Sequence, residues 1–254
     1  EQEIEAFVPK EYWTIDVLLR CLNKPGSFTA HYYGEEKKRE LHSEAEADEV
    51  LRDIAGQEFT IAGIKRTEKR RSPTPPFITS TLQQEASKTL NFSTQKTMSV
   101  AQQLYEGVDI KGSGTVALIS YLRTDSTRVS EEAAKAAHEY IASNYGENYT
   151  SKGQSAKTSG KKIQDAHEAI RPTDLSRTPA AVKDSLTREQ FRLYQLIWKR
   201  FAASQMADAV YETSSVKIDG GKYRFTMSAS RVTFDGFMAV YVQDEEKEGD
   251  SRLL

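Results

Sequence analysis

The 254-residue sequence is poor in cysteine and has no long apolar run. Its single cysteine, Cys21, has no internal partner, which excludes a disulfide framework and favours a reducing compartment. Because Cys21 lies in the apolar run TIDVLLRCL, we expect it to be a small residue of the core. No stretch approaches the roughly 18 consecutive apolar residues of a membrane-spanning helix, and no signal peptide is visible. These absences predict a cytoplasmic protein without a membrane partner.

The sequence also lacks a large net charge, because the formal value is only −2. That charge is unevenly divided along the chain. Residues 66–205 carry 21 Lys and Arg against 14 Asp and Glu, whereas the remaining residues carry 14 basic and 23 acidic side chains. A basic middle between acidic flanks favours a polyanion partner for the middle, and a solvated surface with chance clustering is the alternative.

Both ends of the chain are rich in strand patterns. Apolar and polar residues alternate in 14–22, 27–34 and 58–66, and a helix pattern capped by Ser43 covers 43–56 with Ala47, Val50, Leu51 and Ile54 on its apolar face. Near the other end, a hairpin with Gly220-Gly221 in its turn precedes a further strand-like run at 231–242. The basic segment 66–77 contains three prolines, which cannot continue a sheet, so we expect a domain junction there.

The middle of the chain is mostly helical in pattern. Helices are predicted over 79–92, 93–107, 130–146 and 187–206, and the last has a capping-box pattern at Thr187 and Gln190. Residues 150–164 are rich in Ser, Gly and Lys, which is typical of a mobile loop. These patterns predict an α+β fold with a β-rich domain of residues 1–75 and 206–254 and a mainly helical domain of residues 76–205 inserted into it.

A tyrosine and an arginine stand two positions apart in the segment ISYLRTDSTRVS. The apolar residues before Tyr121 predict a short buried strand, in which Tyr121 and Arg123 share a side. An arginine there could fork onto the oxygens of a phosphodiester that the phenol attacks. The phenolate is also a comparatively good leaving group, which suits the reversible breakage of a nucleic-acid strand. The alternative is a structural tyrosine that ends a strand with its ring in the core.

Five blocks of the sequence together resemble the type IA DNA topoisomerases, and most closely the bacterial topoisomerase I branch. The blocks are PFITSTLQQEAS (76–87), KTMSVAQQLYEG (96–107), YLRTDSTRVS (121–130), DAHEAIRPTD (165–174) and LYQLIWKRFAASQM (193–206). They occur in the order and spacing of the family, so the resemblance covers essentially the whole chain. It implies relaxation of negatively supercoiled DNA through a 5′-phosphotyrosine link, and a bacterial, nucleoid-associated location.

The resemblance also implies roles for individual residues. Tyr121 matches the nucleophile and Arg123 the arginine beside the scissile phosphate. Thr124, Asp125 and Ser126 complete the signature, and we expect them to hold the loop or to contact the DNA. His167 and Arg171 belong to a block that lies near this site in the family. If residues 166–171 form a helical turn, both side chains lie on one face and could grip a phosphate together.

A cluster of hydroxyl and amide side chains stands at the predicted start of the helix at 79–92. Free backbone N–H groups and hydroxyls at such a position can bind phosphate. The cluster comprises Thr79, Ser80, Thr81, Gln83 and Gln84. The alternative is that these residues only cap the helix.

The same resemblance implies parts that this sequence does not contain. In the family, Mg²⁺ is held by a Toprim domain, which also supplies the carboxylate and lysine for proton transfer, and a further domain forms the single-strand groove. The chain has no zinc spacing and starts at Glu1 without a methionine, so we expect an excised piece with no metal site of its own. It would correspond to a β-rich linking domain and a winged-helix-like tyrosine domain, which together form the arch of a toroid. We therefore expect that it cannot relax DNA alone and that its partners are single-stranded or negatively supercoiled DNA and the missing domains.

Three other protein classes are weaker matches. A rolling-circle nuclease needs a His-hydrophobe-His pair, which the sequence lacks. A tyrosine recombinase needs a His-x-x-Arg box with a tyrosine late in the chain, whereas His167 and Arg171 are four residues apart. A non-catalytic module that binds nucleic acid or protein stays open as an alternative.

Overall fold

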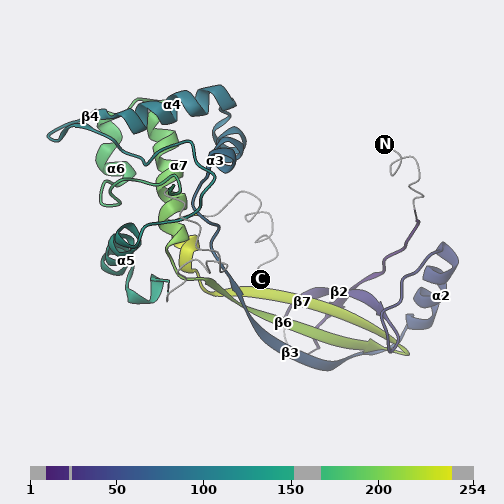
Figure 1. The fold of residues 1–254 in the computed structure, drawn as a ribbon. Helices are drawn as coiled ribbons and strands as arrows, with labels where there is room; N and C mark the ends of the chain where they lie inside the picture. Colours follow the sequence, from purple (N-terminus) through teal and green to yellow (C-terminus); the bar gives the residue numbers. More distant parts are fainter. Residues whose placement is uncertain (1–9, 23–24, 152–166, 242–254) are drawn as a thin grey trace. The chain divides into compact units, whose positions relative to one another are not determined.

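The computed structural model describes residues 10–22, 25–151 and 167–241, and most of the predicted loop at 150–164 lies outside these ranges (Figure 1). The described residues divide into two compact units. Unit 1 comprises residues up to 69 together with 212–231, and unit 2 comprises 70–211 together with the residues from 232. The domain limits given above stay a prediction. None of the helices in the described ranges is both long and apolar enough to cross a membrane.

A largely antiparallel sheet of five strands, in the order β1-β2-β7-β6-β3, is the main element of unit 1 (Figure 1). The chain is therefore mixed α and β, as the sequence patterns predict. The hairpin between β6 and β7 is confirmed, and Gly221 in its turn has a φ of 61°, which favours glycine. The strands are β1 (Asp16–Arg20), β2 (Ser27–Gly34), β3 (Phe59–Arg71), β6 (Ala209–Gly220) and β7 (Tyr223–Phe234).

Helix α2 (Glu44–Ile54) supplies the apolar cover of this sheet. The hydroxyl of Ser43 accepts a hydrogen bond from the backbone N–H of Glu46, so the predicted cap is confirmed. Three helix residues are buried together with sheet residues in one core, namely Ala47, Val50 and Ile54 with Ile218, Tyr223 and Phe225. Leu51 was expected on the same face, but it is 47% exposed because it follows Val50 by only one position and so points away from the sheet.

Three other expectations for the β-rich part are corrected. Cys21 is exposed rather than in the core, because β1 ends at Arg20 and the cysteine stands in the following turn, where its N–H bonds the carbonyl of Gly26 at 3.3 Å. Strand β3 continues through the basic residues to Arg71, so it is longer than the predicted 58–66. The predicted strand at 231–242 instead splits into the end of β7 and a 3-10 helix, η4 (Gly236–Ala239), which begins at a glycine with a φ of 51°.

Unit 2 is built around helix α7 (Arg188–Ser204) (Figure 1). Its predicted capping box is confirmed, because Thr187 and Gln190 exchange hydrogen bonds between side chain and backbone. The buried face of α7 includes Leu193, Ile197 and Phe201 and packs into one core with the other helices. Those helices are α3 (Thr79–Glu85), the π-helical segment η1 (Ala86–Leu90), α4 (Thr94–Glu106), α5 (Glu131–Tyr145) and α6 (Pro179–Val182), with short 3-10 helices η2 (Glu147–Tyr149) and η3 (Lys183–Ser185).

The segment before Tyr121 is less regular than its composition predicts. A small hairpin of β4 (Val108–Ile110) and β5 (Gly114–Val116) precedes it, and β5 ends at Val116. Between Val116 and Tyr121, Ile119 alone forms a bridge with another described residue, namely Pro172. The expected strand up to Tyr121 is thus shortened, since its backbone pairs with a distant chain segment at one position instead of along a ladder.

Candidate active site

Tyr121 lies on the exposed side of an extended segment of unit 2. Leu122 and Thr124 are buried, whereas Tyr121, Arg123 and Asp125 are exposed, so side chains alternate although no strand is formed. The Tyr121 side chain is 46% exposed, and the edge of its ring meets the ring of Tyr105 at a centroid distance of 5.5 Å. The Tyr121 side chain is therefore accessible to solvent, and the ring of Tyr105 supports it on one side.

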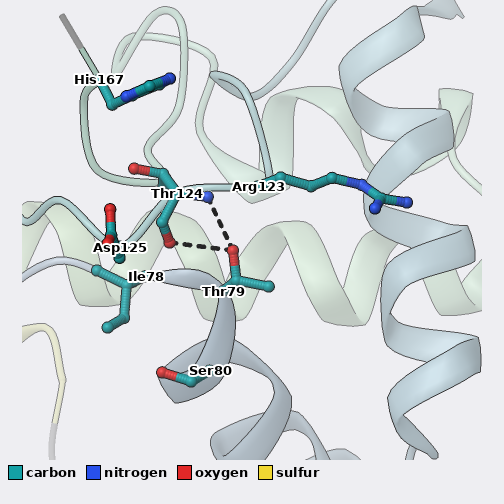
Figure 2. Close-up of a pocket in the computed structure, with 7 residues that line it drawn as sticks. All are labelled: Ile78, Thr79, Ser80, Arg123, Thr124, Asp125 and His167. Atoms are coloured by element: carbon teal, nitrogen blue, oxygen red, sulfur yellow. Dashed lines mark hydrogen bonds between the residues drawn. The ribbon is translucent and has the colours of Figure 1, made fainter.

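Thr79, at the start of α3, holds this segment in place. Its hydroxyl donates to the carbonyl of Leu122 at 2.8 Å or of Thr124 at 3.0 Å and accepts from the N–H of Thr124 at 2.9 Å (Figure 2). The N–H of Thr79 also donates to the carbonyl of Thr124 at 2.9 Å. The backbone on the C-terminal side of Tyr121 is therefore attached to the helix start by both backbone and side chain.

A depression of about 360 Å³ opens beside this attachment (Figure 2). Its lining brings together residues of three predicted motifs, namely Ile78, Thr79, Ser80, Arg123, Thr124, Asp125 and His167. The Arg123 side chain extends away from the other labelled side chains. Within the described part of the chain, neither Arg123 nor Asp125 forms an ion pair. The guanidinium of Arg123 is thus available to an anion.

The hydroxyls of Thr124 and Ser126, on either side of Asp125, shape the loop itself. Thr124 accepts a hydrogen bond from the N–H of Ser126 at 3.1 Å, and Ser126 accepts one from the N–H of Arg128 at 3.3 Å. Thr124 and Ser126 were expected either to hold the loop or to contact the DNA. These hydrogen bonds show that both residues hold the loop. Any contact with nucleic acid stays a prediction for them and for Asp125.

Residues 167–172 do not form the helical turn on which the pairing of His167 and Arg171 depended. The segment is extended because its backbone pairs outwards. The N–H of Ile170 donates to the carbonyl of Phe77 at 2.8 Å, and the N–H of Ser120 donates to the carbonyl of Arg171 at 2.9 Å. His167 lines the depression, whereas Arg171 does not. The direct role of Arg171 on DNA stays a prediction.

Arg171 instead has an intramolecular partner, Glu168, that the sequence analysis missed. Its Nε and NH2 groups lie 2.9 and 2.7 Å from the Glu168 carboxylate, its NH1 donates to the carbonyl of Pro172 at 3.0 Å, and its side chain is 17% exposed. Burial raises the pKa of Glu168, but the hydrogen bonds from Arg171 and Ser130 and the nearby charge of Arg128 outweigh burial, so the pKa lies below its ordinary value. The spacing of three residues between Glu168 and Arg171 was the only available signal for this pair.

The hydroxyl cluster at the start of α3 divides into internal and open groups. Thr79 holds the backbone of Thr124. The Thr81 hydroxyl accepts a hydrogen bond from the N–H of Ile78 at 3.0 Å, so Thr81 caps the helix. Ser80 is exposed and lines the depression, and Gln83 is partly buried. Ser80 is therefore the member of the cluster that best suits a ligand in the depression.

A metal site was not expected in this chain. Across 10–22, 25–151 and 167–241, three or more His, Cys, Asp or Glu side chains nowhere gather in a way that could hold a metal ion. The expectation that this chain has no metal site of its own stays a prediction, and no chemical step below is assigned to a metal.

Comparison with known proteins places the whole chain in one family. A family profile described as DNA topoisomerase matches residues 1–253. The structure of full-length topoisomerase I from Thermotoga maritima is similar with a TM-score of 0.73 and 37% sequence identity. That alignment covers 96% of this chain but 38% of the Thermotoga chain, so the sequence spans less than half the length of that protein.

Proposed function

Because the chain belongs to the DNA topoisomerase family, we propose that it carries the nucleophile of a bacterial type IA topoisomerase, an isomerase that relaxes negatively supercoiled DNA. The observation that carries this proposal is the exposed Tyr121 two residues before an exposed Arg123, which forms no ion pair with the described residues and lines the same depression as His167 and Ser80. Tyr121 is the nucleophile, and Arg123 binds the phosphate that it attacks.

Cleavage follows from these two side chains. The Tyr121 oxygen bonds to phosphorus while the bond from phosphorus to the 3′-oxygen of the neighbouring nucleotide breaks. The phenol loses its proton, and the departing 3′-oxygen gains one. Arg123 stabilises the charge on the non-bridging oxygens because a guanidinium can donate two parallel hydrogen bonds to phosphate. The reverse reaction reseals the strand, since the phosphotyrosine bond conserves the energy of the phosphodiester.

His167 and Ser80 are suited to hold the DNA rather than to react. Both line the depression beside Arg123 and can donate to phosphate oxygens or bases. The roles expected for Thr124, Asp125, Ser126 and Arg171 remain part of this proposal. Thr79 acts indirectly by fixing the backbone of Thr124.

The isolated chain is proposed to be incomplete as an enzyme. It spans 38% of the Thermotoga protein. Relaxation is therefore assigned to a longer protein that adds a Mg²⁺-binding Toprim domain and a groove-forming domain to the linking domain and tyrosine domain of the arch. Single-stranded DNA or negatively supercoiled duplex DNA is the substrate, in the nucleoid of a bacterial cytoplasm.

A covalent trapping assay tests the nucleophile. The chain is mixed with a separately expressed Toprim domain, Mg²⁺ and 3′-labelled single-stranded DNA, because the fragment that becomes linked to the protein through its 5′-phosphate keeps the original 3′ end, and denaturing gels then detect protein-linked DNA. We expect Tyr121→Phe to abolish the adduct and to leave DNA binding nearly unchanged. The control is Tyr12→Phe, which removes the hydroxyl of another exposed tyrosine, 71% exposed and located in unit 1, and which should form the adduct normally.

Two results would reject the proposal in different ways. An adduct that persists in Tyr121→Phe would show that another residue is the nucleophile. The second result is that neither the unmodified chain nor a variant forms an adduct, although the chain binds DNA. In a plot of the logarithm of the binding constant against the logarithm of the salt concentration, the slope would then be about −0.7 per phosphate contact, and the chain would be a non-catalytic binding module.

A further inference from the structure

Arg200, on helix α7, is a nearly buried charge in unit 2 with only 6% of its surface exposed. Its Nε donates to the carbonyl of Pro75 at 2.7 Å. Its guanidinium also lies over the ring of Phe77, at 4.8 Å from the centroid, and 5.7 Å from the ring centroid of Tyr241. The arginine thus contacts the chain segment that leads into α3.

The segment held by Arg200 cannot be fixed by an ordinary ladder of backbone hydrogen bonds. Prolines occupy positions 73, 75 and 76, and none of them has an N–H to donate. Within residues 73–77, Phe77 alone forms a bridge with another described residue, namely Ile170. The proline carbonyls remain free to accept, so the donor that reaches Pro75 from α7 helps to set the position of this segment.

The same segment lies between the two backbone stretches that carry the proposed site. The carbonyl of Phe77 accepts from the N–H of Ile170, three residues after His167, and Thr79 holds the backbone of Thr124, next to Arg123. A shift of the Pro75–Phe77 backbone would consequently move both sides of the depression relative to each other.

The energetics of Arg200 argue against a purely stabilising role. Its NH1 atom is buried and has no hydrogen-bond partner among the residues that the structure describes, so part of a charged donor group has lost its hydration without full replacement. Apolar residues of similar volume often stabilise a fold as well as, or better than, such a buried charge. The attraction of the guanidinium to the two aromatic rings and its hydrogen bond with the Tyr241 side chain offset only part of that cost.

We propose that Arg200 is a positioning residue for strand cleavage, which holds the Pro75–Phe77 backbone so that Thr79 places the Tyr121 and Arg123 segment opposite His167. This inference rests on the proposed function. It assigns to Arg200 no contact with DNA or with the reacting atoms.

The test uses the full-length topoisomerase that contains this chain, with variants Arg200→Met and Arg200→Lys. Methionine keeps much of the volume and removes the donors, and lysine keeps the charge and the ability to donate from a single nitrogen but loses the planar guanidinium. The matched control is Arg192→Met, because Arg192 lies on the same helix with its guanidinium 5.6 Å from the ring centroid of Phe92, away from Pro75. Three quantities are measured for each protein: the single-turnover rate of adduct formation, the Kd for single-stranded DNA, and the thermal unfolding midpoint.

We expect Arg200→Met to lower the rate of adduct formation at least about tenfold, because small misplacement of reacting groups is costly. The Kd should change less than twofold, and the unfolding midpoint should stay the same or rise. Arg200→Lys should recover part of the rate, and Arg192→Met should resemble the wild type in rate and affinity.

A wild-type rate in Arg200→Met would overturn the inference. So would a loss of folding, or a fall in rate that tracks a fall in the unfolding midpoint, because either result would show a structural role. Tyr121→Phe is run alongside. If it still forms the adduct, the proposed function itself fails, whereas a wild-type Arg200→Met with an inactive Tyr121→Phe rejects only the role of Arg200.

Discussion

Removing the Thr79 hydroxyl tests whether this residue holds the segment that carries Tyr121. Thr79→Val keeps the shape of the side chain and the backbone bond from the N–H of Thr79 to the carbonyl of Thr124. It removes the acceptor for the N–H of Thr124 and the donor to the carbonyl of Leu122, both of which belong to buried residues. A buried polar group left without a partner costs ~1–3 kcal/mol, so two of them predict a loss of about 2–6 kcal/mol in the free energy of unfolding.

Unit 2 can be followed separately in this experiment because the chain has only two tryptophans. Trp198 is buried in the core of unit 2, where its Nε1 donates to the carbonyl of Leu175 at 3.0 Å, whereas Trp13 belongs to unit 1. In a Trp13→Phe background, the fluorescence of Trp198 during urea denaturation reports the unfolding of unit 2 alone.

Thr89→Val is the matched control for Thr79→Val. The hydroxyl of Thr89 donates to the carbonyl of Glu85 four residues earlier in the same helical stretch, a back-bond that adds little stability. We expect this control to lose less than about 0.5 kcal/mol, which is usual for substitutions away from special sites. Equal losses for Thr79→Val and Thr89→Val would refute the role given to Thr79.

Two further predictions concern a close contact in unit 1 and a titration in unit 2. Gly220→Ala should destabilise unit 1 by about 1–3 kcal/mol, because the added methyl group meets the ring of Phe59, whereas Gly63→Ala, which meets nothing within 4 Å, should stay near the wild type in urea denaturation. The lowered pKa of Glu168 means that its contribution to stability is present at neutral pH and is lost as the pH falls below its unfolded value of about 4.3. Glu168→Gln should therefore be less stable than the wild type at pH 7, and this difference should shrink in acid as the pair with Arg171 is lost. A difference that stays constant between pH 7 and pH 3 would contradict the linkage.

The sequence alone determined the local features of the fold. Caps at Ser43 and Thr187 and the glycine turn between β6 and β7 depend on side chains and φ angles within a few residues of each other, so short patterns predict them. The alternation around Tyr121 is equally local. These features place the motifs on their elements before any long-range contact is known.

Only the tertiary structure decided how the motifs meet. Residues 167–172 became extended because they pair with Phe77 and Ser120, which lie far away in the sequence. Cys21 and Leu51 are exposed because no other part of the described chain covers them. Their apolar character alone does not predict which side of an element is covered. The Thr79 and Arg200 contacts span dozens of residues, and such pairings depend on the packing of the whole unit rather than on any sequence window.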